Sequence, residues 1–128
     1  MKESLKELMK NSYAPYSNFR VAAIVEMKDG KFFGGVNVEN AAYGSGICAE
    51  RSAILSAISA GYKKGDFERI YLMLENGKFG WPCMACRQVI LEFFERDKFI
   101  TSVDADGNME SHTVSELCPY PFTDEDMK

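Results

Sequence analysis

The residues best suited to chemistry are two cysteines in the stretch WPCMACR, residues 81–87. Cys83 and Cys86 are three positions apart, so at the start of a helix both thiols can face one object. Such a pair is a redox couple, a disulfide or half of a zinc site. The redox interpretation requires a motif just after an early strand of a thioredoxin-like fold, whereas this motif comes late in the chain.

A third cysteine, Cys48, opens the tripeptide Cys-Ala-Glu. Three thiolates leave one tetrahedral position of a zinc ion open, as catalytic zinc sites require. Glu50 is then better suited to carrying protons than to binding the metal. Three thiolates also make the site negative, and two helix N-termini are expected to offset that charge. Arg51 and Arg87 each follow a cysteine closely, and we expect them to donate hydrogen bonds to the sulfurs.

The elements that position these residues alternate between helical and strand patterns. Helices are predicted at 2–11, 48–60 and 83–95, and strands at 19–27, 31–40 and 68–75. Residues 98–107 are predicted to be a strand that runs into an Asp-Gly turn, with a further short strand near 109–113. This order predicts an α/β fold, a three-layer α-β-α sandwich with a mixed five-stranded sheet. The length of 128 residues predicts a single domain over the whole chain.

Longer strings around the cysteines carry a family resemblance. Cys-x-Glu followed by Pro-Cys-x-x-Cys resembles the zinc nucleoside and nucleobase deaminases. NVENAAYGSGICAERSAI (37–54) and PCMACRQVILEF (82–93) resemble the small, homotetrameric cytidine deaminases. YAPYSNFRV (13–21) and ELCPYPFTDEDM (116–127) are similar to the same family, so the resemblance covers nearly the whole chain.

The resemblance implies zinc-dependent hydrolytic deamination of cytidine and deoxycytidine to uridine or deoxyuridine and ammonia, in pyrimidine salvage. Zinc is the implied cofactor, held by Cys48, Cys83 and Cys86, and no organic cofactor is needed. Glu50 is the implied catalytic residue, which carries protons from water to ring N3 and to the departing amine.

The resemblance also implies a substrate site. Its members would be Phe19, Asn37, Glu39, Ala49 and Phe122. The phenylalanine at 19 would stack on the pyrimidine, and the pair at 37 and 39 would hold the ribose hydroxyls. Phe122 would reach into the pocket of a neighbouring subunit, in a homotetramer with shared active sites, and Tyr43 would lie at the same boundary.

Three residues depart from the family pattern. Met84 stands where glycine is usual, Trp81 where small residues are common, and Ala22 where glycine is usual in the first strand. These departures leave the ligands intact, but they bear on the shape of the pocket.

Other functions compete with this one. A deaminase of the same fold could act on a nucleoside antibiotic such as blasticidin S, although the Asn37-x-Glu39 pair suits free ribose hydroxyls. A non-enzymatic zinc module would need Cys118 as a fourth thiolate, whereas a buried free thiol is the simpler expectation. His112 is the only histidine and is expected on a strand or at the surface.

Composition and charge exclude several classes of protein. The net charge is −4 and no basic run occurs, which argues against nucleic-acid binding and against a polynucleotide-editing deaminase. Residues 1–11 lack the apolar region of a signal peptide, and no stretch is long enough to span a membrane. We therefore expect a cytoplasmic protein, whose four cysteines stay reduced.

Overall fold

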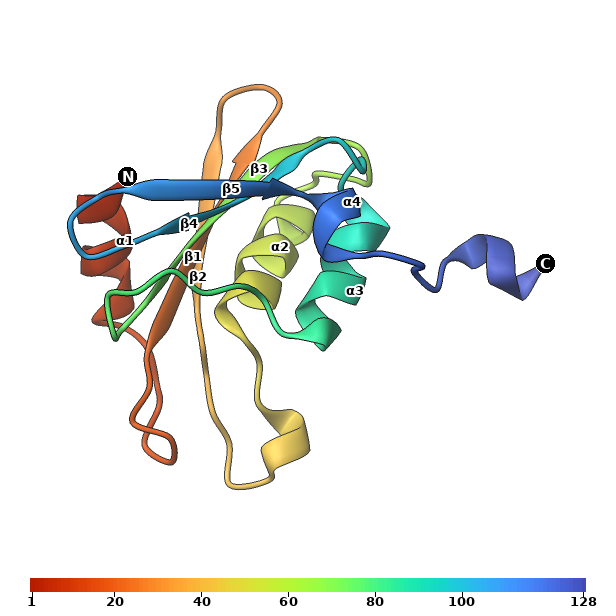
Figure 1. The fold of residues 1–128 in the computed structure, drawn as a ribbon. Helices are drawn as coiled ribbons and strands as arrows, with labels where there is room; N and C mark the ends of the chain where they lie inside the picture. The colour runs from red at the N-terminus through yellow and green to blue at the C-terminus, as the bar shows by residue number, and fades with distance from the viewer.

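A five-stranded sheet lies at the centre of the computed structural model, which describes all residues from 1 to 128 (Figure 1). Its strands are β1 (Val21–Met27), β2 (Phe32–Val36), β3 (Phe67–Leu74), β4 (Phe99–Val103) and β5 (Met109–Thr113). They lie in the order β2-β1-β3-β4-β5. Only the β3–β4 pair is parallel, and the other pairs are antiparallel. The predicted mixed five-stranded sheet is confirmed.

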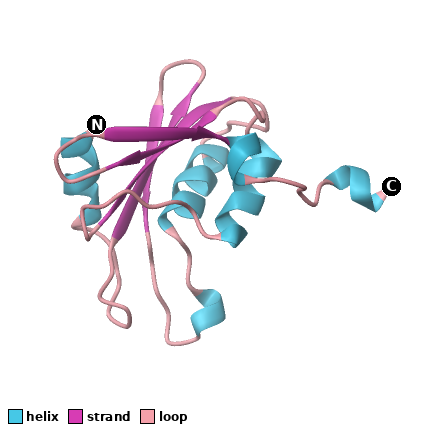
Figure 2. Cartoon of the chain, in the orientation of Figure 1, coloured by secondary structure: helices cyan, strands magenta, loops and turns pink.

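Helices cover both faces of this sheet (Figure 2). Helix α1 (Lys2–Met9) lies on one face, and α2 (Ala49–Ser59) and α3 (Met84–Phe93) lie on the other. The remaining short helices are η1 (Tyr43–Ser45), α4 (Val114–Leu117) and η2 (Asp124–Met127). No helix combines the length and the apolar character that crossing a membrane requires. The three-layer arrangement is confirmed.

Strand β1 is apolar on both sides because it is buried on both sides. Ala23 and Val25 belong to the larger core beneath α2 and α3. Ala22 and Ile24 belong to the smaller core beneath α1, which Leu5 fills. The alanine at 22, a departure from the family pattern, is fully buried in that smaller core.

One glycine of β2 sets how close α2 comes to the sheet. A Cβ atom at Gly35 would overlap the main chain of Ala53 and the side chain of Ser52. The missing side chain therefore lets α2 lie directly on the strand, and α2 begins beside the residues that could bind a metal.

Strand β2 is shorter than predicted, and its early end has a consequence for the loops. Beyond Val36 the chain continues through Val38, which forms isolated bridges to Tyr13 and to Ile47. Three segments far apart in sequence are thereby joined at the end of the sheet where the loops around 12–18 and 40–46 project (Figure 1).

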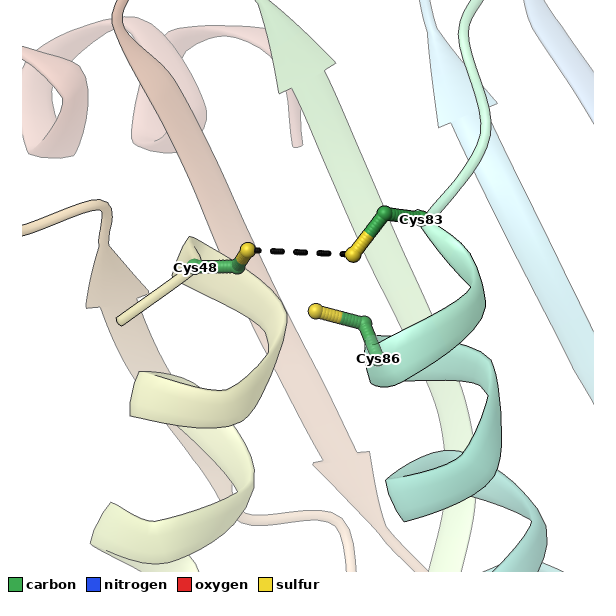
Figure 3. Close-up of side chains that lie close together, drawn as sticks. All are labelled: Cys48, Cys83 and Cys86. Carbon is green, nitrogen blue, oxygen red and sulfur yellow. Dashed lines mark hydrogen bonds between the residues drawn. The ribbon is translucent and has the colours of Figure 1, made fainter. Parts of the chain in front are cut away.

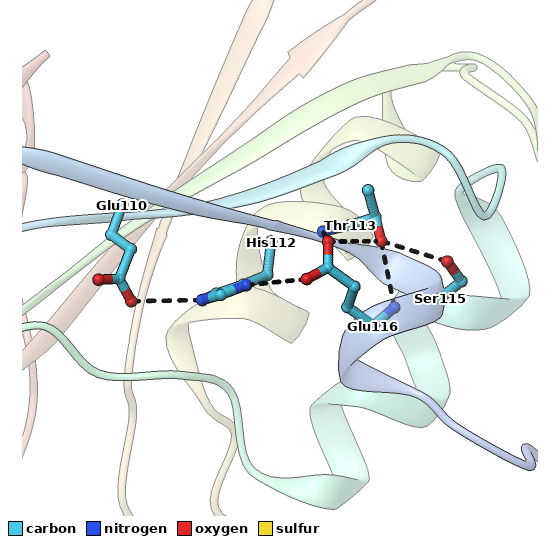
Figure 4. Close-up of polar contacts among 5 residues, drawn as sticks. All are labelled: Glu110, His112, Thr113, Ser115 and Glu116. Atoms are coloured by element: carbon cyan, nitrogen blue, oxygen red, sulfur yellow. Dashed lines mark hydrogen bonds and ion pairs between the residues drawn. The ribbon is translucent and has the colours of Figure 1, made fainter.

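The only histidine lies on β5, as expected, between two carboxylates (Figure 4). His112 Nδ1 is 3.2 Å from Glu116 and Nε2 is 3.3 Å from Glu110. Its ring also contacts Trp81 edge to face, with centroids 4.7 Å apart. The hydrogen bond to Glu116, with a further one to Glu110, raises the pKa of His112 above its usual value of 6.5. The strand is thus tied to the segment that leads into the cysteine motif.

We expect protonation of His112 to change the fluorescence of Trp81, the only tryptophan. Because the folded pKa is raised, the stabilisation is complete below about pH 6.5 and is lost as the pH rises through the folded value. A pH titration of tryptophan emission should show a transition above pH 6.5 that His112→Gln lacks. Urea unfolding should likewise show a larger stability difference between the two proteins at pH 6 than at pH 9. Identical titration curves for both proteins would contradict this coupling.

Candidate metal centre and substrate site

The three cysteines of the predicted ligand set meet between the N-terminal ends of α2 and α3 (Figure 3). The sulfurs of Cys48, Cys83 and Cys86 all lie within 4.8 Å of one another. The Cys48 and Cys83 sulfurs are 3.9 Å apart. Tetrahedral zinc with Zn–S bonds of about 2.3 Å places its sulfurs about 3.8 Å from one another. The donor set and its spacing therefore fit zinc.

The start of each helix explains why the sulfurs meet here. Cys48 and Cys83 are the N-cap residues of α2 and α3, both with extended backbone, and Cys86 lies in the first turn of α3. Helix N-termini carry unpaired N–H groups and the positive end of the macrodipole. Two such ends favour the thiolate form of the cysteines, as the sequence predicted.

One arginine supports the sulfurs directly. Arg51 Nη2 lies 3.7 Å from the Cys48 sulfur, and the buried Arg51 Nε has no hydrogen-bond partner. The second arginine does not behave as expected. Arg87 donates from Nε to the Pro82 carbonyl at 2.7 Å and from Nη1 to the Leu117 carbonyl at 3.1 Å. Its guanidinium therefore fixes the turn before Cys83 and the end of α4, and it makes no hydrogen bond to a sulfur of the cluster.

The surroundings of the cysteine cluster favour the thiolate form of Cys48. Hydrogen bonds from Cys86 and Arg51 lower the pKa of the Cys48 thiol to about 5, against the effect of its partial burial. The same hydrogen bond to Cys48, together with burial, raises the pKa of Cys86. At neutral pH one thiolate therefore accepts hydrogen bonds, and a dication would displace the remaining thiol protons.

The fourth cysteine stands apart from this cluster. The Cys118 thiol is half-buried and lies 3.7 Å from the Arg87 carbonyl. Only the other three cysteines come together closely enough to share a metal. His112 is held by two carboxylates on β5. Three cysteines thus lie close enough to hold a metal, and a tetrahedral ion bound by them would have a fourth position for a non-protein group.

Glu50 lies in the first turn of α2 and is only 4% exposed. Burial raises the pKa of its carboxyl to about 7. A carboxyl with a pKa near the working pH both accepts and returns protons readily. Glu50, two residues after Cys48, therefore has the pKa that a proton carrier needs.

Asn37 and Glu39 follow β2 and contact the loop that leads to Phe19. The Asn37 side chain donates to the Phe19 carbonyl at 2.8 Å and accepts from the Val21 N–H at 2.9 Å and from the Ser12 hydroxyl. Asn37 is therefore partly occupied in holding the loop, which the sequence did not reveal.

Glu39 accepts hydrogen bonds from the same loop. The N–H groups of Tyr16 and Ser17 donate to Glu39 Oε1 at 2.9 and 3.0 Å, and the Ser17 hydroxyl donates to Oε2. The hydroxyl of Ser17 is the main cause that lowers the pKa of the Glu39 carboxyl. Glu39 also lines a hollow of about 350 Å³ together with Tyr16, Ser17, Asn40, Tyr43 and Gly46.

The other expected substrate residues differ widely in their exposure. Phe19 is 38% exposed at the end of this loop. Ala49 is fully buried, main chain included, and lies at the start of α2. Phe122 is 58% exposed, and its carbonyl accepts from Gln88 on α3. Tyr43 is 81% exposed and its ring contacts that of Tyr16, so most of its surface is free to contact a neighbouring subunit.

Comparison with known proteins agrees with this geometry. Residues 1–102 match the family described as the cytidine and deoxycytidylate deaminase zinc-binding region. The cytidine deaminase of Halalkalibacterium halodurans is 40% identical, covering 99% of this chain and 94% of the relative. That of Mycoplasma genitalium is 36% identical, covering 94% and 91%. The crystal structure of cytidine deaminase from Burkholderia pseudomallei superposes with a TM-score of 0.88 at 41% identity, covering 94% of both chains.

These matches extend over the helix ends that carry the three cysteines and over Glu50. The resemblance found in the sequence is therefore confirmed across nearly the full length, and the chain belongs to the cytidine deaminase family.

Proposed function

We propose that this protein deaminates cytidine and deoxycytidine hydrolytically, yielding uridine or deoxyuridine and ammonia in pyrimidine salvage. Residues 1–128 would form the single catalytic domain. The observation that carries the proposal is the buried Glu50 carboxyl two residues after Cys48, beside a three-thiol cluster with zinc spacing. Free thiols suit a cytoplasmic enzyme, since that compartment keeps cysteines reduced.

The chemistry expected of a zinc ion at the three thiolates is Lewis acidity toward water. Glu50 accepts a proton from the water that attacks C4 of the base. It delivers that proton to N3, then takes the proton of the hydroxyl now on C4 and delivers it to the amino group, which leaves as ammonia. Arg51 donates a hydrogen bond to the Cys48 sulfur, and its positive charge compensates for the negative charge of the thiolates.

We expect the substrate to contact Glu39, which lines the hollow, and Phe19 and Asn37, which lie outside its lining. Phe19 offers an aromatic face to the pyrimidine, and Asn37 and Glu39 offer polar groups to the ribose hydroxyls. The residues that line the hollow include a carboxylate and no lysine or arginine. A 5′-phosphate would find no cation there, so the site suits the free nucleoside.

Absorbance spectroscopy tests this function, because deamination changes the spectrum of the base. The purified, zinc-loaded protein should convert cytidine to uridine and ammonia, and cytidine 5′-monophosphate should be a much poorer substrate. No turnover of cytidine would refute the proposal, and equal turnover of the monophosphate would refute the assignment to free nucleosides.

We further propose that the active sites are shared within a homotetramer. The segment after Cys118 leads away from the body of the protein (Figure 1). Phe122 and the fully exposed Tyr120 lie on it, with Pro119 and Pro121 preventing a continuous helix. An extended segment with exposed aromatic side chains suits a pocket on a neighbouring subunit.

Phe122→Ala is expected to lower kcat/KM for cytidine about 10–100-fold, because a buried aromatic contact contributes about 1.5–3 kcal/mol. Met127→Ala, in the same segment and 78% exposed, is the matched control and should keep wild-type activity. Light scattering should give the mass of a tetramer for the wild type.

Mixed oligomers make the test sharper. Subunits carrying Glu50→Gln can lend Phe122 to neighbours carrying Phe122→Ala. Exchange of the two inactive or impaired proteins should then recover activity above that of either alone. A fully active monomer, or exchanged oligomers without recovery, would contradict shared sites.

A further inference from the structure

Ser17 connects two residues of the proposed substrate site. Its hydroxyl donates to Glu39 Oε2 and accepts a hydrogen bond from the Phe19 N–H at 3.0 Å. Its own N–H donates to Glu39 Oε1 at 3.0 Å. One short residue therefore contacts both oxygens of a carboxylate and the main chain of the expected stacking residue.

The surrounding backbone gives this serine a fixed place. Asn18, directly after it, has a φ of 55°, a left-handed conformation that asparagine tolerates better than most residues. Asn37 holds the far side of the same turn through the Phe19 carbonyl and the Val21 N–H. The position of Ser17 is thus set by main-chain geometry on both sides.

Glu39, in contrast, is only half-buried, and it lines the hollow together with Tyr16 and Asn40. Hydrogen bonds from the 16–17 segment hold its carboxylate instead. The Ser17 hydroxyl supplies the one bond to Oε2, while both main-chain bonds go to Oε1. Loss of that hydroxyl would leave Oε2 without a protein donor and the carboxylate free to turn about its remaining bonds.

We propose that Ser17 is a positioning residue for sugar recognition, which holds the Glu39 carboxylate in the orientation that receives the ribose hydroxyls. This inference rests on the proposed function and extends it to a residue that does not itself touch the base. Preorganised polar groups bind more tightly because no ordering cost is left to the complex.

The test compares two substrates in one variant. Ser17→Ala should raise KM for cytidine roughly tenfold while kcat changes less than about twofold, since one charge-assisted hydrogen bond is lost. 2′,3′-Dideoxycytidine offers no ribose diol to Glu39. Any effect transmitted through Phe19 is common to both substrates, so the ratio of the two kcat/KM values isolates the contribution of Glu39. In Ser17→Ala, kcat/KM for cytidine divided by kcat/KM for 2′,3′-dideoxycytidine should be roughly tenfold lower than in the wild type.

Three further variants serve as controls. Ser17→Thr keeps the hydroxyl and should restore the wild-type ratio. Ser4→Ala, an exposed serine on α1, should change neither constant. In a Glu39→Gln background, Ser17→Ala should have no further effect on the ratio, because a positioning residue acts only through the group it positions. If Ser17→Ala does not fold, Ser17→Cys replaces it, since a thiol is similar in shape and a weak donor.

An unchanged substrate ratio in Ser17→Ala, or an equal loss in the Glu39→Gln background, would overturn the role of Ser17. Both results presuppose an active wild type. A wild-type protein that turns over neither nucleoside would instead overturn the proposed function, and the inference with it.

Discussion

Replacing Glu50 with glutamine should leave the fold and the zinc content intact while kcat for cytidine falls about 10²–10⁴-fold. Glutamine has the same shape and remains polar, so the small buried site in α2 can accept it. It cannot take a proton from water or deliver one to the amine. Because the proposed reaction asks Glu50 to move a proton more than once, the loss should lie toward the upper end of that range.

The measurement combines steady-state kinetics with elemental analysis of zinc in the same preparation. Glu92→Gln on α3, an exposed glutamate with one long ion pair to Lys64 at 3.8 Å, is the matched control and should keep full activity. A Glu50→Gln protein with near-wild-type kcat would show that another group carries the protons.

Part of the cysteine cluster was predictable from the sequence because its geometry is local. Cys83 and Cys86 are fixed relative to each other by one helical turn, and Cys48 needed only a second helix that starts nearby. Cys48 was joined to this pair by the resemblance of its Cys-x-Glu motif to the deaminase pattern, and the structure brings both helix starts together. The ends of elements were less predictable, as β2 stops at Val36 although the predicted strand continued to residue 40.

The hydrogen-bond partners of the two arginines could not be predicted from the sequence. Arg51 and Arg87 both come shortly after a cysteine, so the sequence predicts a hydrogen bond to a sulfur equally for each. The choice depends on carbonyls that only the fold supplies, namely those of Pro82 and Leu117 beside Arg87. Arg51 has no such acceptors, and its guanidinium contacts Cys48.

The loop around Ser17 was unpredictable for a similar reason. Residues 12–18, SYAPYSN, have the composition of a turn, and Asn37 and Glu39 lie two positions apart near the end of the predicted strand 31–40. Contact between the two arises because β2 ends early and Val38 bridges to Tyr13, a pairing across more than twenty residues. Periodicity reports on the faces of helices and strands, whereas it carries no information on which loops meet.

Cys83→Ala should reduce bound zinc from one per chain to a small fraction and abolish turnover. Two thiolates cannot hold the metal as three do, and even loss of a group that only supports a ligand costs about 10–100-fold in affinity. The Cys83 side chain makes no capping hydrogen bond to α3, so the substitution should not itself unfold the helix. Zinc loss can therefore be assigned to the missing ligand.

Stability provides a measurement independent of activity. Zinc that binds only the folded protein raises Tm, so a chelator should lower the Tm of the wild type and leave that of Cys83→Ala unchanged. Cys118→Ala is the matched control, because its thiol lies outside the cluster against the Arg87 carbonyl. That variant should keep one zinc, the chelator effect and full activity. Full zinc occupancy in Cys83→Ala would refute the three-cysteine site, and zinc loss in Cys118→Ala would point instead to a closed site of four thiolates, which has no open position for catalysis.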